Sequence, residues 1–240
     1  MVSGHLKNPA TQKWICLYTA FIIYFDDTLE KDASMVREFQ QRFLAGRPQE
    51  NALLDQYAVF VRKAWIHFHP ACANLVVTSI LDFITGLLID AENPSIEVHK
   101  RAVNYPRWMR TLNGGSRAFA FFIFPPEIPL EVRRYSPSSS AMLTGPLFHS
   151  NFSDLLSFYK EELRGETTNQ VSLLAQLAGK TKLEALRQLS RGSIERIRRS
   201  RDVLSKHSDA YAIYVKHFLP GYVRYYITEK RYKLGDLDLA

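Results

Sequence analysis

Three oxygen-bearing side chains repeat every four residues within residues 151–161 (NFSDLLSFYKE). Ser153, Ser157 and Glu161 lie at i, i+4 and i+8, and each step of four advances only about 40° around an α-helix. A helix over this segment would therefore present two hydroxyls and a carboxylate as one stripe. Hard oxygen ligands suit Mg²⁺, which usually keeps several waters and binds substrate phosphate as well. The alternative is a solvated helix face, because Ser and Glu are common on protein surfaces.

A second acidic cluster ends the apolar run of residues 14–25. Asp26 and Glu30 are i and i+4 on one helical face, and Asp27 lies beside them. Acidic pairs usually cap helices or lie in solvent, so this spacing alone does not define a site. Here the carboxylates follow a helix apolar enough to be buried, and burying them costs several kcal/mol unless a cation compensates. A metal cluster would supply that compensation.

The two clusters resemble the metal motifs of class I terpene synthases. Asp26-Asp27-x-x-Glu30 resembles the aspartate-rich motif of that family. Residues 153–161 resemble its second metal motif, N-D-x-x-S-x-x-x-E. The similarity is greatest to fungal trichodiene synthase and its relatives, which carry an almost identical D-L-x-S-F-Y-K-E run.

Two further segments agree with that family in order and approximate spacing. Residues 110–114 (RTLNG) resemble its R-R-M-N-G segment, whose first arginine senses diphosphate. Residues 229–232 (EKRY) resemble its C-terminal D-R-R-Y element. The resemblance covers roughly residues 14–236, and the joint pattern is far more specific than any single motif.

The resemblance implies an all-α fold, a class I terpenoid synthase-type helical bundle formed by a single domain over residues 1–240. It implies a sesquiterpene synthase that ionises farnesyl diphosphate with Mg²⁺, bound as three ions, and cyclises the allylic carbocation while releasing diphosphate. The metal ligands carried over from the motifs are Asp26, Asp27, Glu30, Ser153, Ser157 and Glu161. The residues expected to donate charge-assisted hydrogen bonds to the diphosphate during catalysis are Arg110, Lys160, Arg231 and Tyr232. Two pocket aromatics are expected to stabilise the carbocation through their ring faces, Tyr222 and Tyr225.

The sequence departs from the family pattern at three points. Ser153 replaces the first Asn of the second metal motif, so Asp154, which shares a helical face with Ser157 and Glu161, is an alternative first ligand. The family's helices before the aspartate-rich motif and its tail after the Arg-Tyr element are almost entirely absent. We therefore expect apolar surface open to water, with marginal stability, self-association such as a homodimer, or pairing with another chain. A catalytically impaired truncated homologue is kept as an alternative.

The length and composition favour one globular domain. The chain has 240 residues, of which 46% are hydrophobic and 23% charged, as in ordinary soluble proteins. Only Cys16 and Cys72 are present, which favours a reducing, cytoplasmic setting over a disulfide framework. The apolar run of residues 14–25 is shorter than the roughly 20 residues of a membrane span. Asp82 interrupts a second apolar run, residues 74–89. We expect no membrane span.

Helical periodicity appears almost throughout, with no convincing strand pattern. Apolar spacing predicts helices over residues 35–44, 52–67 and 74–89, and Pro70 is expected to break the chain before the third. His67 and His69 do not predict a metal site, because side chains at i and i+2 point apart on a helix.

A basic segment provides a rival interpretation. The net charge is +7, and residues 180–201 carry eight Lys or Arg. The apolar side of this predicted amphipathic helix consists of Leu183, Leu186, Ile194 and Ile197. A non-enzymatic helical protein that binds RNA or anionic lipid is therefore an alternative. A solvated face on a packed helix is the more usual explanation, and we expect no nucleic-acid partner.

A chain-elongating prenyltransferase is the other enzymatic alternative. That class normally carries two aspartate-rich motifs, whereas this chain has one such motif and the Ser/Glu stripe.

Overall fold

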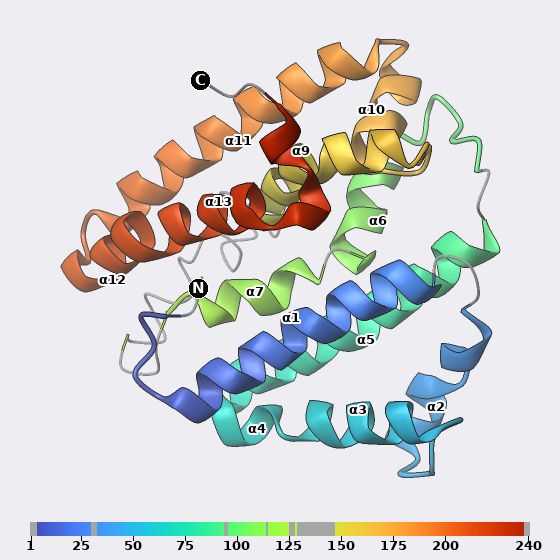
Figure 1. The fold of residues 1–240 in the computed structure, drawn as a ribbon, viewed down its shortest axis with the longest axis vertical. Coiled ribbons are helices and arrows are strands. Elements are labelled where there is room, and N and C mark those ends of the chain that lie inside the picture. The colour runs from blue at the N-terminus through green and yellow to red at the C-terminus, as the bar shows by residue number, and fades with distance from the viewer. Residues whose placement is uncertain are drawn as a thin grey trace.

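The regular structure is helical in every part of the chain that the structure describes. The computed structural model describes residues 4–29, 33–93, 96–113, 115–124, 128 and 147–237. No strand occurs within these ranges, and the helices pack into one bundle (Figure 1). The expected all-α fold is confirmed.

Two long helices form the centre of the N-terminal half. α1 (Pro9–Leu29) and α5 (Pro70–Glu92) run side by side (Figure 1). The shorter elements of this half are η1 (Ser34–Val36), α2 (Phe39–Leu44), α3 (Ala52–Arg62), α4 (Ala64–His67), α6 (Tyr105–Asn113) and α7 (Ser116–Phe122). Buried side chains of α1, α5 and the shorter elements packed on them form one core that includes Tyr18, Phe25, Tyr57, Ile80 and Ile84. This core packs α1 and α5 together, and the last turns of these two helices carry the polar side chains of Asp26 and Asp90.

Three predicted helices differ from the structure in their boundaries. The predicted helix over residues 35–44 is divided into η1 and α2 by a turn at residues 37 and 38. The predicted helix over residues 52–67 is interrupted at Lys63, between α3 and α4. The third predicted helix begins at Pro70 rather than after it, because proline has no N–H to lose in the first turn of a helix. The His69 ring caps this helix by accepting a hydrogen bond from the Ala71 N–H at 3.4 Å.

The C-terminal half packs against the first from the other side of α6 and α7 (Figure 1). It consists of α9 (Leu147–Leu163), α10 (Gln170–Ala178), α11 (Lys182–Leu204), α12 (Ser208–Ala212), η2 (Ile213–Phe218), α13 (Leu219–Thr228), η3 (Lys230–Tyr232) and η4 (Leu234–Asp236). A second core fills this half and is rich in tyrosine, with Tyr214, Tyr222, Tyr226 and Tyr232 all buried. Two of these tyrosines contact α9: the Tyr226 hydroxyl lies 2.6 Å from the Ser153 hydroxyl, and the Tyr222 ring packs against Phe152.

A π-helical turn leads into the helix that carries these tyrosines. The π turn, η2, lies directly before α13, and Pro220 occupies the first turn of α13. Because Pro220 cannot donate to a carbonyl of the preceding turn, the regular hydrogen-bond ladder is broken at this point. π turns of this kind occur frequently beside functional sites.

The basic segment is helical, as predicted, but only half of its predicted apolar side is packed into the bundle: Leu186 and Ile197 are partly buried against the cores of the C-terminal half. Leu183 is 54% exposed and Ile194 is 47% exposed. The fully buried residues of α11 are Ala185, Leu189, Ser193, Ser200 and Leu204. Small side chains and leucines therefore share the face of α11 that packs against α9 and α10.

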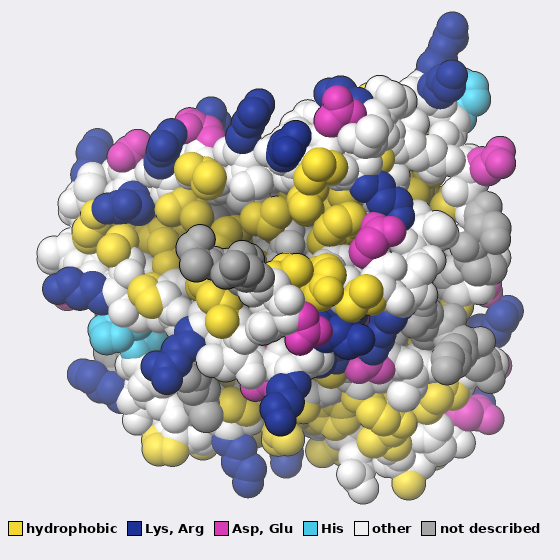
Figure 2. Space-filling model, turned by 45° about the horizontal axis from the view of Figure 1, so that its top comes forward, with side chains coloured by type: hydrophobic (Ala, Val, Ile, Leu, Met, Phe, Trp, Pro, Cys, Tyr) yellow, Lys and Arg dark blue, Asp and Glu magenta, His cyan; other side chains and the backbone are white. Residues whose placement is uncertain are grey.

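Lys and Arg side chains spread along this edge of the molecule, beside a band of apolar side chains (Figure 2). A groove of about 470 Å³ is lined by residues of α9, α11 and α13, among them Phe152, Ile197, Val223 and Ile227. Several charges of the α11 segment have partners: Lys182 with Glu162, Arg199 with Glu195, and Arg201 with Tyr211. These charges belong to a partly paired helix surface.

Helix α5 is long and apolar enough to cross a membrane, with a mean hydropathy of 1.9 over 18 residues. Of these 18 residues, 56% are buried inside the bundle. Asp82, which interrupts the apolar run, forms an ion pair with Arg117 of α7. The helix therefore has the contacts of a core helix.

Candidate active site

A cavity of about 750 Å³ is lined by residues of α1, α5, α6, α9 and α13. Much of its wall is apolar and includes Ile15, Ile22, Ile23, Phe83, Leu87, Met109 and Phe119. The remaining wall carries nearly all of the described candidate residues. A cavity of this size suits a small-molecule ligand with an apolar body and a polar end.

Helix α9 places the predicted stripe on the cavity wall. Ser153, Ser157 and Glu161 all line the cavity, and the Ser157 hydroxyl donates a 2.5 Å hydrogen bond to Glu161 Oε1. Burial raises the pKa of Glu161, while the Ser157 hydrogen bond and the charge of Lys160 oppose this rise. The Ser153 hydroxyl lies 2.6 Å from the Tyr226 hydroxyl of α13. Ser153 is thus already engaged by a neighbouring helix.

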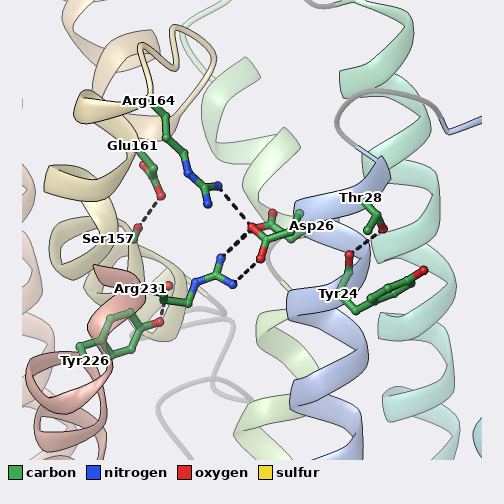
Figure 3. Close-up of polar contacts among 10 residues, drawn as sticks. Tyr24, Asp26, Thr28, Ser157, Glu161, Arg164, Tyr226 and Arg231 are labelled. Carbon is green, nitrogen blue, oxygen red and sulfur yellow. Dashed lines mark hydrogen bonds and ion pairs between the residues drawn. The ribbon is translucent and has the colours of Figure 1, made fainter. Parts of the chain in front are cut away.

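The aspartates at the end of α1 face the stripe from another side. Asp26 lines the cavity, and among the described residues its carboxylate contacts Arg231 at 3.5 Å. Asp27 is bound more closely, at 2.7 Å from Arg231 Nη1 and 3.2 Å from Arg164 Nη1. Figure 3 shows both arginines reaching toward α1 from the C-terminal half. Glu30 lies outside the described residues, so its predicted role stays a prediction.

An ion pair within the cavity wall links α6 to α9. Arg110 Nη2 lies 2.5 Å from Asp154 Oδ1, and Asp154 is only 4% exposed. Burial raises the pKa of the Asp154 carboxyl to about 7, against the opposing effect of Arg110. Burial lowers the pKa of Arg110, but the charges of Asp154, Glu161 and Asp26 outweigh it and keep the guanidinium protonated. The positive charge of Arg110 is therefore fixed beside the cavity.

The other predicted diphosphate donors also line this cavity. Lys160 is buried next to Glu161, and Arg231 and Tyr232 approach from η3. Tyr222 and Tyr225 are likewise on the wall, as the resemblance implies. Every predicted site residue that the structure describes lines one cavity, except Asp27, which reaches it through Arg231.

Several polar residues of the site are absent from the predicted set. Tyr226 contacts Ser153, Arg164 contacts Asp27, and Asn113 accepts a 3.3 Å hydrogen bond from Arg110. Helical spacing offered a signal for two of them, since Tyr226 is i+4 from Tyr222 and Arg164 is i+3 from Glu161. Asp90, which also lines the cavity, belongs to none of the recognised motifs.

The donor set fits a hard divalent cation that shares its coordination with a ligand. Asp26, Ser157 and Glu161 offer oxygen atoms, as Mg²⁺ requires. Asp154 Oδ2 is buried and has no hydrogen-bond partner among the described residues. Within the same part of the chain, no three Asp, Glu, His or Cys side chains lie closely enough together to hold a metal ion without other ligands. An ion here would therefore complete its shell with waters and ligand oxygens, as Mg²⁺ commonly does.

An all-helical bundle whose cavity brings these motifs together has the architecture of a class I terpene synthase. Residues 6–238 match the trichodiene synthase (TRI5) family. The chain is 32% identical to alpha-cuprenene synthase COP6 of Coprinopsis cinerea over 98% of its own length and 70% of that protein. It is 31% identical to monoterpene synthase 25 of Postia placenta, over 98% of this chain and 69% of the relative. Trichodiene synthase of Fusarium poae is 25% identical, over 92% and 58% of the two chains. The chain therefore belongs to the trichodiene synthase family.

Proposed function

We propose that this protein is a terpene cyclase that ionises farnesyl diphosphate with Mg²⁺ and cyclises the resulting allylic cation. The observation that carries the proposal is the single cavity, in which acidic and hydroxyl oxygens, four cationic side chains and an apolar wall meet. The four cations are Arg110, Lys160, Arg164 and Arg231. Together they suit a ligand with a diphosphate at one end and a hydrocarbon chain at the other.

The residues that would hold Mg²⁺ come from two helices. Asp26 would contribute from α1, with Asp27 and Glu30 supporting that motif, and Ser153, Ser157 and Glu161 would contribute from α9. Three bound ions would neutralise charge on the departing diphosphate as Lewis acids. Ser157 and Glu161 support this role most directly, because their oxygens already converge at 2.5 Å.

The cationic side chains would stabilise negative charge as the carbon–oxygen bond of the substrate breaks. Arg110 is held by its ion pair with Asp154 and Lys160 by burial, so they need little reorganisation to donate hydrogen bonds to diphosphate oxygens. Arg231 and Tyr232 would donate from η3. Because guanidinium donates from a planar fork, both arginines suit bidentate contact with phosphate oxygens.

The apolar and aromatic wall would protect the cation that remains. Water would capture an allylic cation, so the hydrocarbon part of the site has to exclude it. Tyr222 and Tyr225 offer ring faces for cation–π attraction. The buried core around Tyr222 fixes its ring, with Phe152 and Tyr226 as neighbours.

We place this reaction in the cytoplasm, because Cys16 and Cys72 are not joined by a disulfide and suit a reducing setting. The homodimer stays a prediction, which sedimentation equilibrium tests. Membership of the trichodiene synthase family favours the cyclase over a chain-elongating prenyltransferase and over a non-enzymatic RNA or lipid binder.

Release of diphosphate from farnesyl diphosphate, with and without Mg²⁺, tests the proposal. A cyclase releases diphosphate only with the metal and yields cyclic hydrocarbons or their alcohols, identified by gas chromatography and mass spectrometry. A prenyltransferase instead needs isopentenyl diphosphate and yields a longer diphosphate. Absence of turnover on farnesyl diphosphate by the folded protein, at saturating Mg²⁺, would refute the proposal.

A further inference from the structure

Asp90, in the last turn of α5, is a cavity carboxylate to which the proposed function gives no role. Its Oδ2 accepts a 2.7 Å hydrogen bond from the side-chain amide of Asn113, at the end of α6. Asn113 Oδ1 in turn accepts a 3.3 Å hydrogen bond from Arg110 Nη1. A continuous chain of hydrogen bonds therefore runs from α5 to the arginine that pairs with Asp154.

The charges at the two ends of this chain fix the orientation of the Asn113 amide. An ionised carboxylate only accepts hydrogen bonds and a guanidinium only donates them. The amide nitrogen must therefore face Asp90 and the amide oxygen must face Arg110. Burial raises the pKa of Asp90, while the Asn113 hydrogen bond and the Arg110 charge lower it, so the same neighbours stabilise the ionised form.

Gly86 brings the Asn113 backbone within reach of Asp90. Gly86 is one helical turn before Asp90 on α5. A Cβ atom at position 86 would lie 2.7 Å from Asn113 N and 2.8 Å from Asn113 Cα and Cβ. The end of α6 can rest against α5 at this distance only because residue 86 has no side chain.

We propose that Asp90 is a positioning residue that, together with Gly86, orients Asn113. The Asn113 amide oxygen then holds the Arg110 guanidinium toward the substrate diphosphate. The inference rests on the proposed function, since it assigns Arg110 to diphosphate. Asp90 acts through Asn113 and Arg110 and does not itself touch the substrate.

Binding of inorganic pyrophosphate in the presence of Mg²⁺, measured by titration calorimetry, tests this role apart from turnover. Asp90→Leu should weaken binding about tenfold, which corresponds to about 1.4 kcal/mol. Asp90→Asn keeps an acceptor oxygen for the Asn113 amide and should restore most of the affinity. Glu92→Leu is the matched control, because Glu92 is an exposed carboxylate on the same helix that pairs with Arg37. It should bind as the wild type does.

A double-mutant cycle tests whether Asp90 acts through its neighbour. In an Asn113→Leu background, Asp90→Leu should cause no further loss of affinity. Additive losses would show that Asp90 acts on the ligand directly and would overturn the inference. Equal weakening by Asp90→Leu and Asp90→Asn would also overturn it, since a hydrogen-bond role requires rescue by Asn.

The role of Gly86 is tested by one glycine variant and a control variant at another glycine. Gly86→Ala should weaken pyrophosphate binding, whereas Gly192→Ala in α11 should not, because a Cβ there meets nothing closer than 3.8 Å. Unchanged pyrophosphate binding by Gly86→Ala would overturn the proposed role of Gly86 in positioning Asn113. If wild-type protein fails to bind pyrophosphate, the proposed function itself fails. If the wild type binds and Asp90→Leu binds equally well, only the present inference fails.

Discussion

Arg231 donates hydrogen bonds to both carboxylate oxygens of Asp27, at 2.7 and 3.2 Å, and so joins residues 204 positions apart in the chain. The contact connects η3 to the last turn of α1, where Figure 3 shows the Arg231 side chain reaching α1. Arg164 adds a single contact to the same carboxylate at 3.2 Å. The geometry of the Arg231 pair depends on a planar guanidinium, which lysine does not provide.

We predict that Arg231→Lys lowers turnover by about tenfold or more, because the positive charge is kept while the bidentate contact is lost. Arg164→Lys should have a smaller effect, since Arg164 makes one contact and is more exposed. Steady-state rates with farnesyl diphosphate, together with thermal melting, check this ranking. A larger loss for Arg164→Lys than for Arg231→Lys would contradict it.

Asp26→Asn is expected to reduce Mg²⁺-dependent turnover by orders of magnitude while leaving the helical circular dichroism signal unchanged. The Asp26 side chain is 52% exposed and its ion pair with Arg231 is long, at 3.5 Å, so its loss should affect ligation more than folding. Asp202→Asn, an exposed position on α11, is the control. Undiminished turnover in the Asp26 variant would remove the metal assignment.

Ser153→Asn should lower the Mg²⁺ concentration that gives half-maximal activity, or create activity in an inert parent. Asn offers a longer side chain with a carbonyl oxygen, which reaches a cation more easily than a hydroxyl held by Tyr226. Ser157→Ala should act in the opposite direction. A change of about tenfold in the Mg²⁺ requirement corresponds to about 1.4 kcal/mol.

Asp154 provides the counter-test for that assignment. If Ser153→Asn leaves the Mg²⁺ dependence unchanged while Asp154→Ala abolishes activity, the motif begins functionally at Asp154. Asp154→Ala removes both a possible metal ligand and the ion-pair partner of Arg110. Arg110→Lys separates these two effects, because it disturbs the ion pair while leaving the Asp154 carboxylate in place.

His67 should show a pKa below 6.5 in the folded protein, because burial and the nearby charge of Lys63 disfavour the protonated ring. The folded chain then binds fewer protons than the unfolded chain at pH below 6.5, so the free energy of unfolding falls as the pH drops through that range. Ring titration by NMR measures the pKa, and urea unfolding of His67→Gln should show a weaker pH dependence. A measured pKa above 6.5 would contradict the prediction.

Helix type could be predicted from local periodicity, whereas the buried side of each helix depended on its tertiary partners. The apolar runs of α1 and α5 identify core helices correctly, because both are buried along much of their length. For α11 the same reasoning selected Leu186 and Ile197, which are partly buried, together with Leu183 and Ile194, which are exposed. It did not select Ser193 and Ser200, which are buried. Close helix packing favours small side chains, and sequence hydrophobicity gives little weight to them.

In the candidate site, residues within one helical motif were predictable and pairings between distant segments were not. Ser157 and Glu161 share a face by spacing alone, and their hydrogen bond follows from it. The Arg110–Asp154 and Asp27–Arg231 pairs join separate helices, so neither spacing nor composition indicates them. Asp90 had no motif to mark it, and only the packing of α6 on α5 reveals its partner.

Crystals soaked with Mn²⁺, a Mg²⁺ substitute, and inorganic pyrophosphate would test the central claim most directly, because anomalous scattering locates the metal. We predict metal peaks beside Asp26 and beside the Ser157–Glu161 pair, with pyrophosphate oxygens within hydrogen-bond distance of Arg110 and Arg231. Metal and pyrophosphate bound away from this cavity, or a cavity left empty at saturating concentrations of both, would contradict the account.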